Sequence, residues 1–578
     1  MSERGGPVHV VTTRRRYKGR EYLTHLLRRS YREDGKVKNE TVGNISHLPA
    51  PLVEVVRRAL RGETFVPASE RLEILRSRPH GHVQAVRAAM EQLDFAALIA
   101  SRPSPERDLV CAMVAARVLA PQTKLATTRW WHTVTLAQEF GVEQADEDDL
   151  YAAMDWLFER QDSIQRKLAA RHLQEGGIAL YDLSSSYFEG TCCPLGKFGH
   201  DRDGKGGKLQ VNYGLLTTRE GCPVAVSVYE GNTADPKTLM PQVSLLRESF
   251  GLERVVLVGD RGMISHKAIK ELRELEGLSW ITALKSVQIR SLVEGEALQL
   301  GLFDERNLVE ITHPDYPGER LIACRNPELA KLRAHKRQSL LEATAKELDK
   351  VRASVETGRL KGKGADAIGV RVGKVINKYK VGKHFALQIT DTSFSYSLLQ
   401  ENIEAEAALD GIYVIRTSVP KKQMPADETV RTYKALANVE RAFRSLKSVD
   451  LEVRPIHHRL EQRVRAHIFI CMLAYYVEWH LREAWRSLLF ADEDRQAKAT
   501  RDPVAPAQRS QSALEKVHTH ALPDGTPAHS FRTLLAELAT LVRNTCRAPL
   551  EQGPIFDVLT TPTPLQRRTL ELIDQIAA

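Results

Sequence analysis

The sequence predicts a multidomain α/β protein built around a mixed β-sheet with helices. Three observations support this fold class. With 578 residues, the chain is too long for a single hydrophobic core. Residues 177–285 alternate between strand-like and helix-like patterns. The flanking segments carry different patterns, which indicates separate structural units on either side.

The first segment, residues 1–51, is predicted to form a basic hairpin. Residues 22–31 and 36–42 alternate between apolar and polar side chains and flank Asp34-Gly35, a strong turn dipeptide. Pro49 and Pro51 end this pattern. Cations cluster between residues 14 and 38, and the most closely spaced are Arg14, Arg15, Arg16 and Lys18.

Residues 52–176 form the second segment, which is predicted to be helical. Apolar residues recur there at the three- and four-residue spacing of helices, as in residues 85–95 and 109–119.

The third segment carries the pattern of the central sheet. Three strands come first, and then a helix, a strand, a helix and a strand. They are residues 178–188, 209–217, 223–229, 239–250, 255–258, 265–275 and 279–284. This order is that of an RNase H-like core.

An α+β insertion, residues 286–409, interrupts the core. It is predicted to contain two strands, a charged helix over residues 327–357 and a basic strip over residues 359–383. Residues 385–389 and 412–415 are predicted strands that return to the core, so the core comprises residues 177–285 and 410–490. In the remainder, residues 491–578, a linker up to residue 530 is followed by a C-terminal helical region.

Residues 429–447 are predicted to form one helix with Asp427 as its N-cap. Tyr433, Glu440 and Lys447 are seven residues apart, nearly two helical turns, and therefore share one face, with Arg444 beside them. A carboxylate framed by cations and a phenol suits a metal ion next to a phosphate. An exposed amphipathic helix with ordinary ion pairs is the alternative.

Three carboxylates hold informative positions in this scheme. Asp182 lies in the first core strand, Asp260 ends the fourth, and Glu440 lies on the closing helix. In an RNase H-like sheet the first and fourth strands are neighbours, so the three acids are expected to converge. Unneutralised, they would raise one another's pKa. Mg²⁺, with Mn²⁺ as the alternative, would resolve this, and two ions about 4 Å apart can assist an in-line displacement.

Composition narrows the class of protein and its compartment. A formal net charge of +10 fits a polyanionic partner such as nucleic acid. No signal peptide is expected at the N-terminus, and the apolar stretch 468–477 is too short to span a membrane. Seven scattered cysteines indicate a reducing cytoplasm. The only conceivable zinc cluster, Cys192-Cys193 with His200 and Cys222, has no CxxC spacing, so zinc is not expected.

Four motifs together resemble a known family. They are Tyr181-Asp-Leu-Ser-Ser-Ser-Tyr-Phe-Glu-Gly190, Tyr229-Glu-Gly-Asn-Thr233, Gly259-Asp-Arg-Gly-Met263 and the Tyr433, Glu440 and Lys447 helix. The chain resembles DDE transposases of bacterial insertion sequences, of the insertion sequence four superfamily, subgroup sixteen-thirty-four. One departure stands out, because the signature arginine three residues after Tyr433 is Leu436 here.

The resemblance implies both a site and an activity. Asp182, Asp260 and Glu440 would be catalytic ligands of two metal ions, while Tyr433 and Lys447 would contact transposon-end phosphates and Arg444 would replace the missing arginine. The N-terminal cations and the helical region would bind double-stranded DNA, both the terminal inverted repeats and the target. Cleavage and strand transfer would need two ends, hence a homodimer, in the cytoplasm at the bacterial nucleoid. The alternatives are an idle DNA-binding relic or regulator, and a nuclease that does not join strands.

Overall fold

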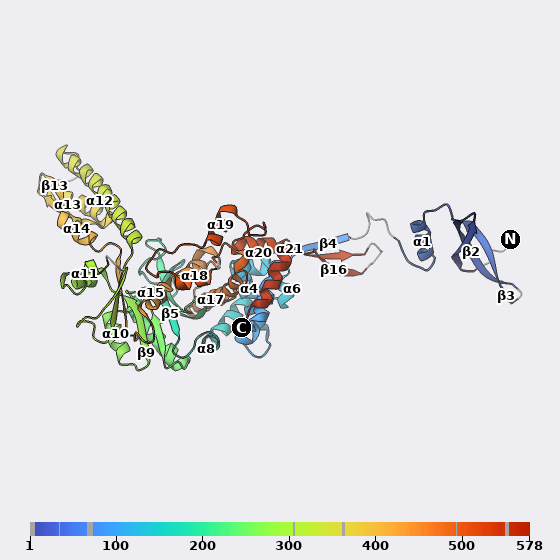
Figure 1. Ribbon diagram of the computed structural model, residues 1–578, viewed down its shortest axis with the longest axis horizontal. Helices are drawn as coiled ribbons and strands as arrows, with labels where there is room; N and C mark the ends of the chain where they lie inside the picture. Colours follow the sequence, from blue (N-terminus) through green and yellow to red (C-terminus); the bar gives the residue numbers. More distant parts are fainter. Residues whose placement is uncertain are drawn as a thin grey trace. The chain divides into compact units, whose positions relative to one another are not determined.

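The computed structural model describes residues 6–33, 35–65, 73–303, 307–360, 364–492, 494–548 and 554–577 (Figure 1). The chain divides into two units. The first comprises Met1–Ser77 and Arg543–Thr560, and the second comprises Arg78–Val542 and Thr561–Ala578.

The first unit begins with a three-stranded antiparallel sheet, β1 (Val8–Tyr17), β2 (Arg20–Glu33) and β3 (Lys36–Asn44), followed by helix α1 (Ala50–Ala59). The predicted β2–β3 hairpin is confirmed, since Glu33 pairs with Lys36 at its end. Asp34 of the predicted turn lies outside the described residues. The prediction missed β1, which pairs with β2 over its whole length.

A second sheet in this unit joins distant parts of the chain. Its order is β16-β15-β4, with β4 at Glu73–Pro79, β15 at Val542–Arg547 and β16 at Ile555–Leu559. Ser77 Oγ donates to Asn544 Oδ1 over 2.6 Å. The segments predicted as wholly helical, 52–176 and 531–578, therefore each contain strand. Partners more than 460 residues apart leave no local pattern from which this pairing could be inferred.

The second unit is built on an eight-stranded sheet in the order β10-β11-β14-β9-β8-β5-β6-β7. β5 runs antiparallel to β6 and parallel to β8, which in turn runs parallel to β9. The predicted adjacency of the first and fourth core strands is confirmed. The strands are β5 (Ile178–Phe188), β6 (Leu209–Thr218), β7 (Pro223–Glu230), β8 (Val255–Val258), β9 (Leu278–Ala283), β10 (Leu308–Ile311), β11 (Arg320–Arg325) and β14 (Ile412–Thr417).

The two faces of the sheet are covered by different helices. Side chains of a strand alternate between faces, and along β5 Ala179, Tyr181 and Leu183 join one buried cluster while Leu180 joins another. The first cluster includes residues of α9 (Leu239–Ser244) and α10 (His266–Arg273). α9 continues as a π-helical turn, Leu245–Ser249.

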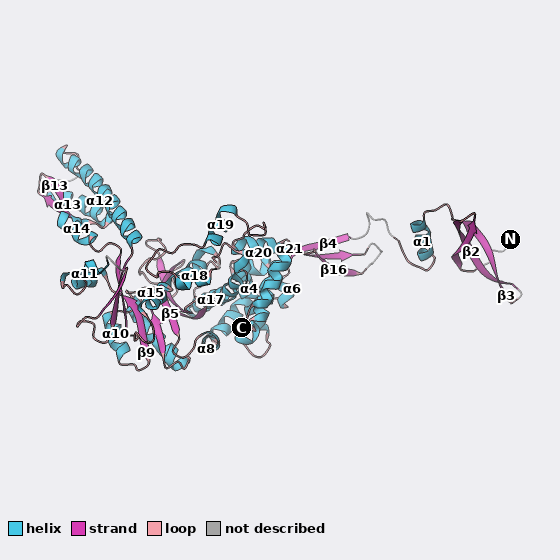
Figure 2. Ribbon diagram, viewed as in Figure 1, coloured by secondary structure: helices cyan, strands magenta, loops and turns pink. Residues whose placement is uncertain are grey.

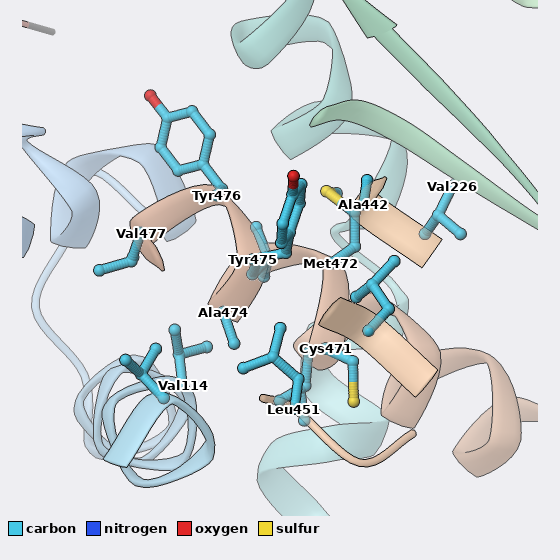
Figure 3. Close-up of a cluster of buried hydrophobic side chains, with 14 of the residues drawn as sticks. Val114, Val226, Ala442, Leu451, Cys471, Met472, Ala474, Tyr475, Tyr476 and Val477 are labelled. Atoms are coloured by element: carbon cyan, nitrogen blue, oxygen red, sulfur yellow. The ribbon is translucent and has the colours of Figure 1, made fainter. Parts of the chain in front are cut away.

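The face that carries Leu180 packs on the predicted closing helices and on the helical region. Helix α17 (Glu461–Ala484) contacts α4, α7 and β7, and Figure 3 shows Val114 of α4 on one side of α17, with Ala442 and Val226 of β7 on the other side. One core therefore runs across the boundary predicted between residues 176 and 177. The helices of this region are α2 (Gly81–Gln92), α3 (Phe95–Ile99), α4 (Pro105–Leu119), α5 (Lys124–Trp130), α6 (Leu136–Phe140), α7 (Glu147–Phe158) and α8 (Gln161–His172).

Helix α17 carries the most apolar stretch of the sequence, and its prediction as a buried helix is confirmed, since Phe469 to Ala474 are fully shielded from solvent. Within the described parts of the chain, no single helix has the length and apolar content needed to cross a bilayer. The bent pair α4 and α5, at 87° to each other, meets that test only when taken together.

The predicted insertion divides in two. Its first strands, β10 and β11, extend the central sheet next to β14. The remainder packs around a separate small core (Figure 2) and consists of α12 (Pro327–Glu356), α13 (Ala365–Tyr379), β12 (Phe385–Ile389), β13 (Phe394–Leu398) and α14 (Gln400–Ala407). The prediction that residues 385–389 return to the core is wrong, because β12 pairs with β13. Lys361 and Lys363 of the basic strip lie outside the described residues.

The C-terminal part is more ordered than a linker. It contains α18 (Arg495–Thr500), α19 (Gln511–Thr519), α20 (Phe531–Ala539) and α21 (Pro564–Glu571). Trp485 at the end of α17 is fully buried, and its Nε1 donates to the Thr569 carbonyl over 2.9 Å. This contact holds α21 against the core of the second unit.

Candidate functional site

The register between β5 and β8 aligns two of the predicted acids. Leu180 is paired with Val258 in the parallel ladder, and Asp182 and Asp260 each follow two residues later. Both acids therefore lie at the carboxyl end of β8. Asp182 is half-buried and accepts from the Leu183 amide, whereas Asp260 is exposed and accepts from the Gly262 amide.

The third acid comes from a helix that packs on β5. This helix, α16 (Leu436–Arg444), follows α15 (Ala426–Lys434). Phe443 of α16 lies edge-on to Tyr213 of β6, with ring centroids 5.8 Å apart, and Asn438 Nδ2 donates to the Arg219 carbonyl. These contacts fix α16 and leave Glu440 exposed.

Asp182 is influenced electrostatically by the other two carboxylates. Burial raises the pKa of Asp182 to about 7, and the negative charges of Asp260 and Glu440 contribute to the shift, against an opposing effect of Arg202. Such coupling requires short separations. The structure therefore brings together Asp182, Asp260 and Glu440 as the sequence predicted.

Tyr433 of α15 lies beside the same group. Burial raises the pKa of the Tyr433 hydroxyl, and Asp260, Glu440 and Asp182 raise it further. Three oxygen-donor carboxylates with a phenol beside them form a hard donor set. A hard divalent cation such as Mg²⁺ fits this set, and it would offset both the burial of the Asp182 carboxylate and its repulsion by Asp260 and Glu440.

Two family models match the chain. Residues 10–68 match the N-terminal domain of the IS1634 family transposases, and residues 190–477 match the transposase DDE domain. Together they cover more than half of the chain. The chain belongs to the DDE transposases of the IS1634 group. Membership implies a DNA partner, nuclease or transesterification chemistry, and a divalent metal ion.

Curated proteins and solved structures were also compared with the chain. No curated protein matches the transposase. Among solved structures, a cryo-EM structure of the piggyBac transposase synaptic complex with hairpin DNA is similar at 9% identity and a TM-score of 0.33, covering 79% of this chain and 77% of that one. The matched DDE segment contains Asp260 and Glu440 but begins after Asp182.

The predicted single helix over residues 429–447 is wrong in detail. α15 ends at Lys434, α16 begins at Leu436, and a π-helical turn occupies Ser445–Val449. The N-cap is Pro425, while Asp427 lies in the first turn and pairs with Arg431. A π turn changes the angular spacing of side chains. Glu440 and Arg444 are exposed, but Lys447 is buried, so the predicted common face does not extend to Lys447.

Lys447 already has a partner in the transposase. Its Nζ donates to Asp203 Oδ1 over 3.0 Å, and Arg454 forms a second ion pair with the same oxygen. The Asp203 side chain is 1% exposed and also accepts from the Tyr187 amide. Asp203 therefore anchors the segment that follows β5 to the protein interior.

Arg444, unlike Lys447, lies at an exposed position on the helix. The described residues offer it neither a hydrogen bond nor an ion pair. Leu436, which stands where the family signature has arginine, is partly buried and packs on the main core. The alternative that Arg444 pairs with Glu440 is not observed.

Two cations near the acids were missed from the sequence. Arg202 lies close enough to Asp182 to oppose its pKa shift; its Nη2 donates to Asp235 over 2.6 Å, and its Nη1 is buried without a partner among the described residues. Arg261 opposes the pKa shift of Tyr433. The Gly-Asp-Arg-Gly motif contained the signal for Arg261, whereas nothing local indicated Arg202.

The N-terminal cations lie together on the first unit. Arg14, Arg15 and Arg16 are exposed on β1, and Lys18 occupies the following turn with a φ of 48°. Only a weak 3.9 Å ion pair joins Arg14 to Glu21. These side chains are available to a polyanion.

Cys222 is not near the cysteines with which the sequence grouped it. Its Sγ lies 4.0 Å from His480 Nε2, and His172 completes a buried group of three. Burial raises the pKa of Cys222 and lowers that of His480 to about 3. All three side chains are thus held uncharged between β7, α8 and α17.

Proposed function

We propose that this transposase binds the terminal inverted repeats of its element, cuts at the ends and joins the 3′-hydroxyls to target DNA. Asp182, Asp260 and Glu440 would hold two divalent ions, Mg²⁺ or alternatively Mn²⁺, on an RNase H-like core. The observation that carries this proposal is the matched position of Asp182 and Asp260 two residues beyond the Leu180–Val258 pair, with Glu440 electrostatically coupled to Asp182.

When bound, the ions would activate a water or 3′-hydroxyl and stabilise the leaving oxygen. The protein's own residues hold the three carboxylates in place. Asp182 is fixed by β5 and by its bond from the Leu183 amide, while Asp260 sits in a turn that its own carboxylate closes through the Gly262 amide. Glu440 depends on the packing of Phe443 on Tyr213.

The cations near the acids differ in whether they already form an ion pair within the protein, and this decides which of them can contact phosphate. Arg444, exposed and without a partner in the described chain, is proposed to contact the DNA backbone, and Tyr433 to orient a phosphate beside the acids. Lys447 could contact DNA only by exchanging Asp203 for a phosphate. We therefore assign it first to positioning the segment around Asp203.

The strand order β7-β6-β5-β8-β9 supports the RNase H-like assignment. Residues 177–285 with 410–490 are proposed as the catalytic core and residues 286–409 as its insertion. The exposed cations of β1 are proposed to hold the terminal repeats, together with the helices up to residue 176. Joining two ends calls for a homodimer, which acts on DNA at the nucleoid.

The test uses the full chain with Asp182→Asn, Asp260→Asn and Glu440→Gln, and Glu189→Gln as the control. Glu189 lies near the end of the same strand but pairs with Lys208. Each of the three variants is expected to lose more than about 100-fold in cleavage of an end fragment in Mg²⁺ or Mn²⁺, with DNA binding retained. Near-normal cleavage by a variant would remove that residue from the site.

The same assay separates the alternatives. Strand-transfer products from the wild type exclude a nuclease that cuts without joining. Binding of end DNA without any cleavage would instead establish the idle relic or regulator.

A further inference from the structure

A cavity of about 780 Å³ lies between α4, α5 and the segment that leads into α17, and none of the three acids lines it. It is lined largely by cations and histidines, and Glu452 is the single acid among the described residues that line it. Its volume lies within the range of small-molecule sites, about 300–1,000 Å³. That is far more space than a single small ion needs.

Two of the lining cations form ion pairs with acids that do not themselves line the cavity. Arg454 pairs with Asp203, and Arg463 pairs with Asp155 over 2.9 Å. These pairs account for the presence of both side chains in the fold without any ligand.

Three other lining cations form no ion pair with an acid among the residues that the structure describes. Arg117 is 7% exposed, and its Nη2 donates to the Gln122 carbonyl over 3.1 Å. Arg459 is exposed and has neither a hydrogen bond nor an ion pair within the described chain. Lys124 is 5% exposed and equally without a partner there. Three like charges facing one cavity repel one another and favour an anion.

Lys124 gives the clearest indication. Burial, and then the charge of Arg117, lowers the pKa of the Lys124 ammonium to about 7. It is also in the first turn of α5, where the helix dipole disfavours a cation. A buried cation without a partner is costly to the fold. A ligand that brings negative charge removes this cost.

The cavity also has an aromatic wall. The Tyr151 ring lies 4.7 Å from the Arg463 guanidinium and 6.0 Å from the His458 ring. Planar groups beside cations suit a nucleobase attached to a phosphate.

We propose that this cavity binds a phosphorylated nucleotide unit, with its phosphate on Lys124, Arg117 and Arg459 and its base toward Tyr151. The nucleotide is either part of a DNA strand held by the transposase or a free nucleotide. The DNA source rests on the proposed function, whereas the binding chemistry does not.

The experiment measures the melting temperature of the full chain at constant ionic strength. The probes are pyrophosphate, thymidine 5′-monophosphate, thymidine and a short oligothymidylate. At about 100-fold excess over Kd, a ligand of the folded state should raise the Tm by about 2–3 °C. The phosphorylated probes should do so, and thymidine should not.

Three variants define the site. Lys124→Met should melt no lower than the wild type without ligand, because a buried charge is removed, and should lose the anion-dependent rise. Arg459→Ala, at an exposed position, should weaken binding about 10-fold. Arg129→Ala, an exposed position on the same helix that does not line the cavity, is the matched control and should behave as the wild type.

The outcomes are distinct. A stronger effect of the oligonucleotide than of the mononucleotide identifies DNA as the source, and equal effects identify a free nucleotide. No phosphate-dependent rise, or an equal rise in Lys124→Met and Arg459→Ala, overturns the proposal. Asp182→Asn should keep the rise while losing cleavage, so the failure of this proposal and the failure of the acid site are separable.

Discussion

Two acids of the second unit, Glu319 and Asp182, differ in how their negative charge is balanced by neighbouring groups. Glu319 is buried and accepts from Arg416 at Nε and Nη2, both over 2.6 Å, and from Arg273. Asp182 is half-buried, yet the charged groups that act on it include two further acids, Asp260 and Glu440. The first arrangement is complete within the chain, whereas we propose that a bound divalent ion completes the second.

The comparison separates structure from function. A compensated buried acid is part of the fold, and removing it leaves its cationic partners unpaired. An uncompensated acid cluster destabilises the metal-free protein and is explained by a ligand. The same distinction divides the cations Lys447, which is paired, and Arg444, which is not.

The largest expected effect comes from the compensated acid. Glu319→Gln should lower the free energy of unfolding by about 3–5 kcal/mol, because Arg416 and Arg273 lose their charged partner. Denaturant unfolding of the full chain measures this. Glu347→Gln, which breaks an exposed surface pair with Lys350, is the control and should leave the free energy of unfolding nearly unchanged, because solvent screens such pairs.

Asp182→Asn should have the opposite effect on stability in chelator, where the variant should be at least as stable as the wild type. If both Asp182→Asn and Glu319→Gln lower stability by similar amounts, the contrast between the two acids does not hold.

Buried histidines extend the comparison to pH. Burial lowers the pKa of His82 to about 4 and the pKa values of His458 and His480 to about 3, from 6.5 in the unfolded chain. The unfolded state therefore binds more protons below pH 6.5, and the stability these groups contribute is present above pH 6.5 and is lost as pH falls towards 4 for His82 and towards 3 for His458 and His480.

At pH 5 each of the three should cost about 2 kcal/mol. His82→Gln should reduce the loss of stability between pH 7 and pH 5 by that amount, as followed by denaturant unfolding at both values. His266→Gln, at an exposed position in the same unit, should leave the loss unchanged. An identical pH dependence in both variants would contradict the assignment.

The smallest effect concerns the two cations of the closing segment. Lys447→Met should destabilise the fold by about 1–2 kcal/mol, because Asp203 loses one of two partners. Arg444→Ala should change stability by less than about 0.5 kcal/mol but weaken end binding about 10-fold. Thermal melts and gel shifts of the full chain test both. Unimpaired cleavage and joining by Arg444→Ala would leave the missing arginine at Leu436 without a substitute.

The central strands were predictable from the sequence because their signals are local. β5 and β8 have the predicted bounds, since β-branched and apolar runs bounded by turns specify a strand directly. The positions of Asp182 and Asp260 followed from these two strands.

The closing helix was less predictable because its breaks depend on packing. Ala435 separates α15 from α16, and the π turn after Arg444 buries Lys447 against Asp203, which is 244 residues away in sequence. Neither feature has a local sequence signal. The same limit applies to β4 with β15 and to Lys124, whose isolation appears only once α4 and α17 surround it.

Metal binding tests the central claim most directly. Calorimetric titration of Mn²⁺ or Mg²⁺ into the full chain should show binding by the wild type that is abolished or strongly weakened in Asp182→Asn, Asp260→Asn and Glu440→Gln, while Glu319→Gln retains it under conditions where it is folded. Metal binding that persists unchanged in the three variants would contradict the account.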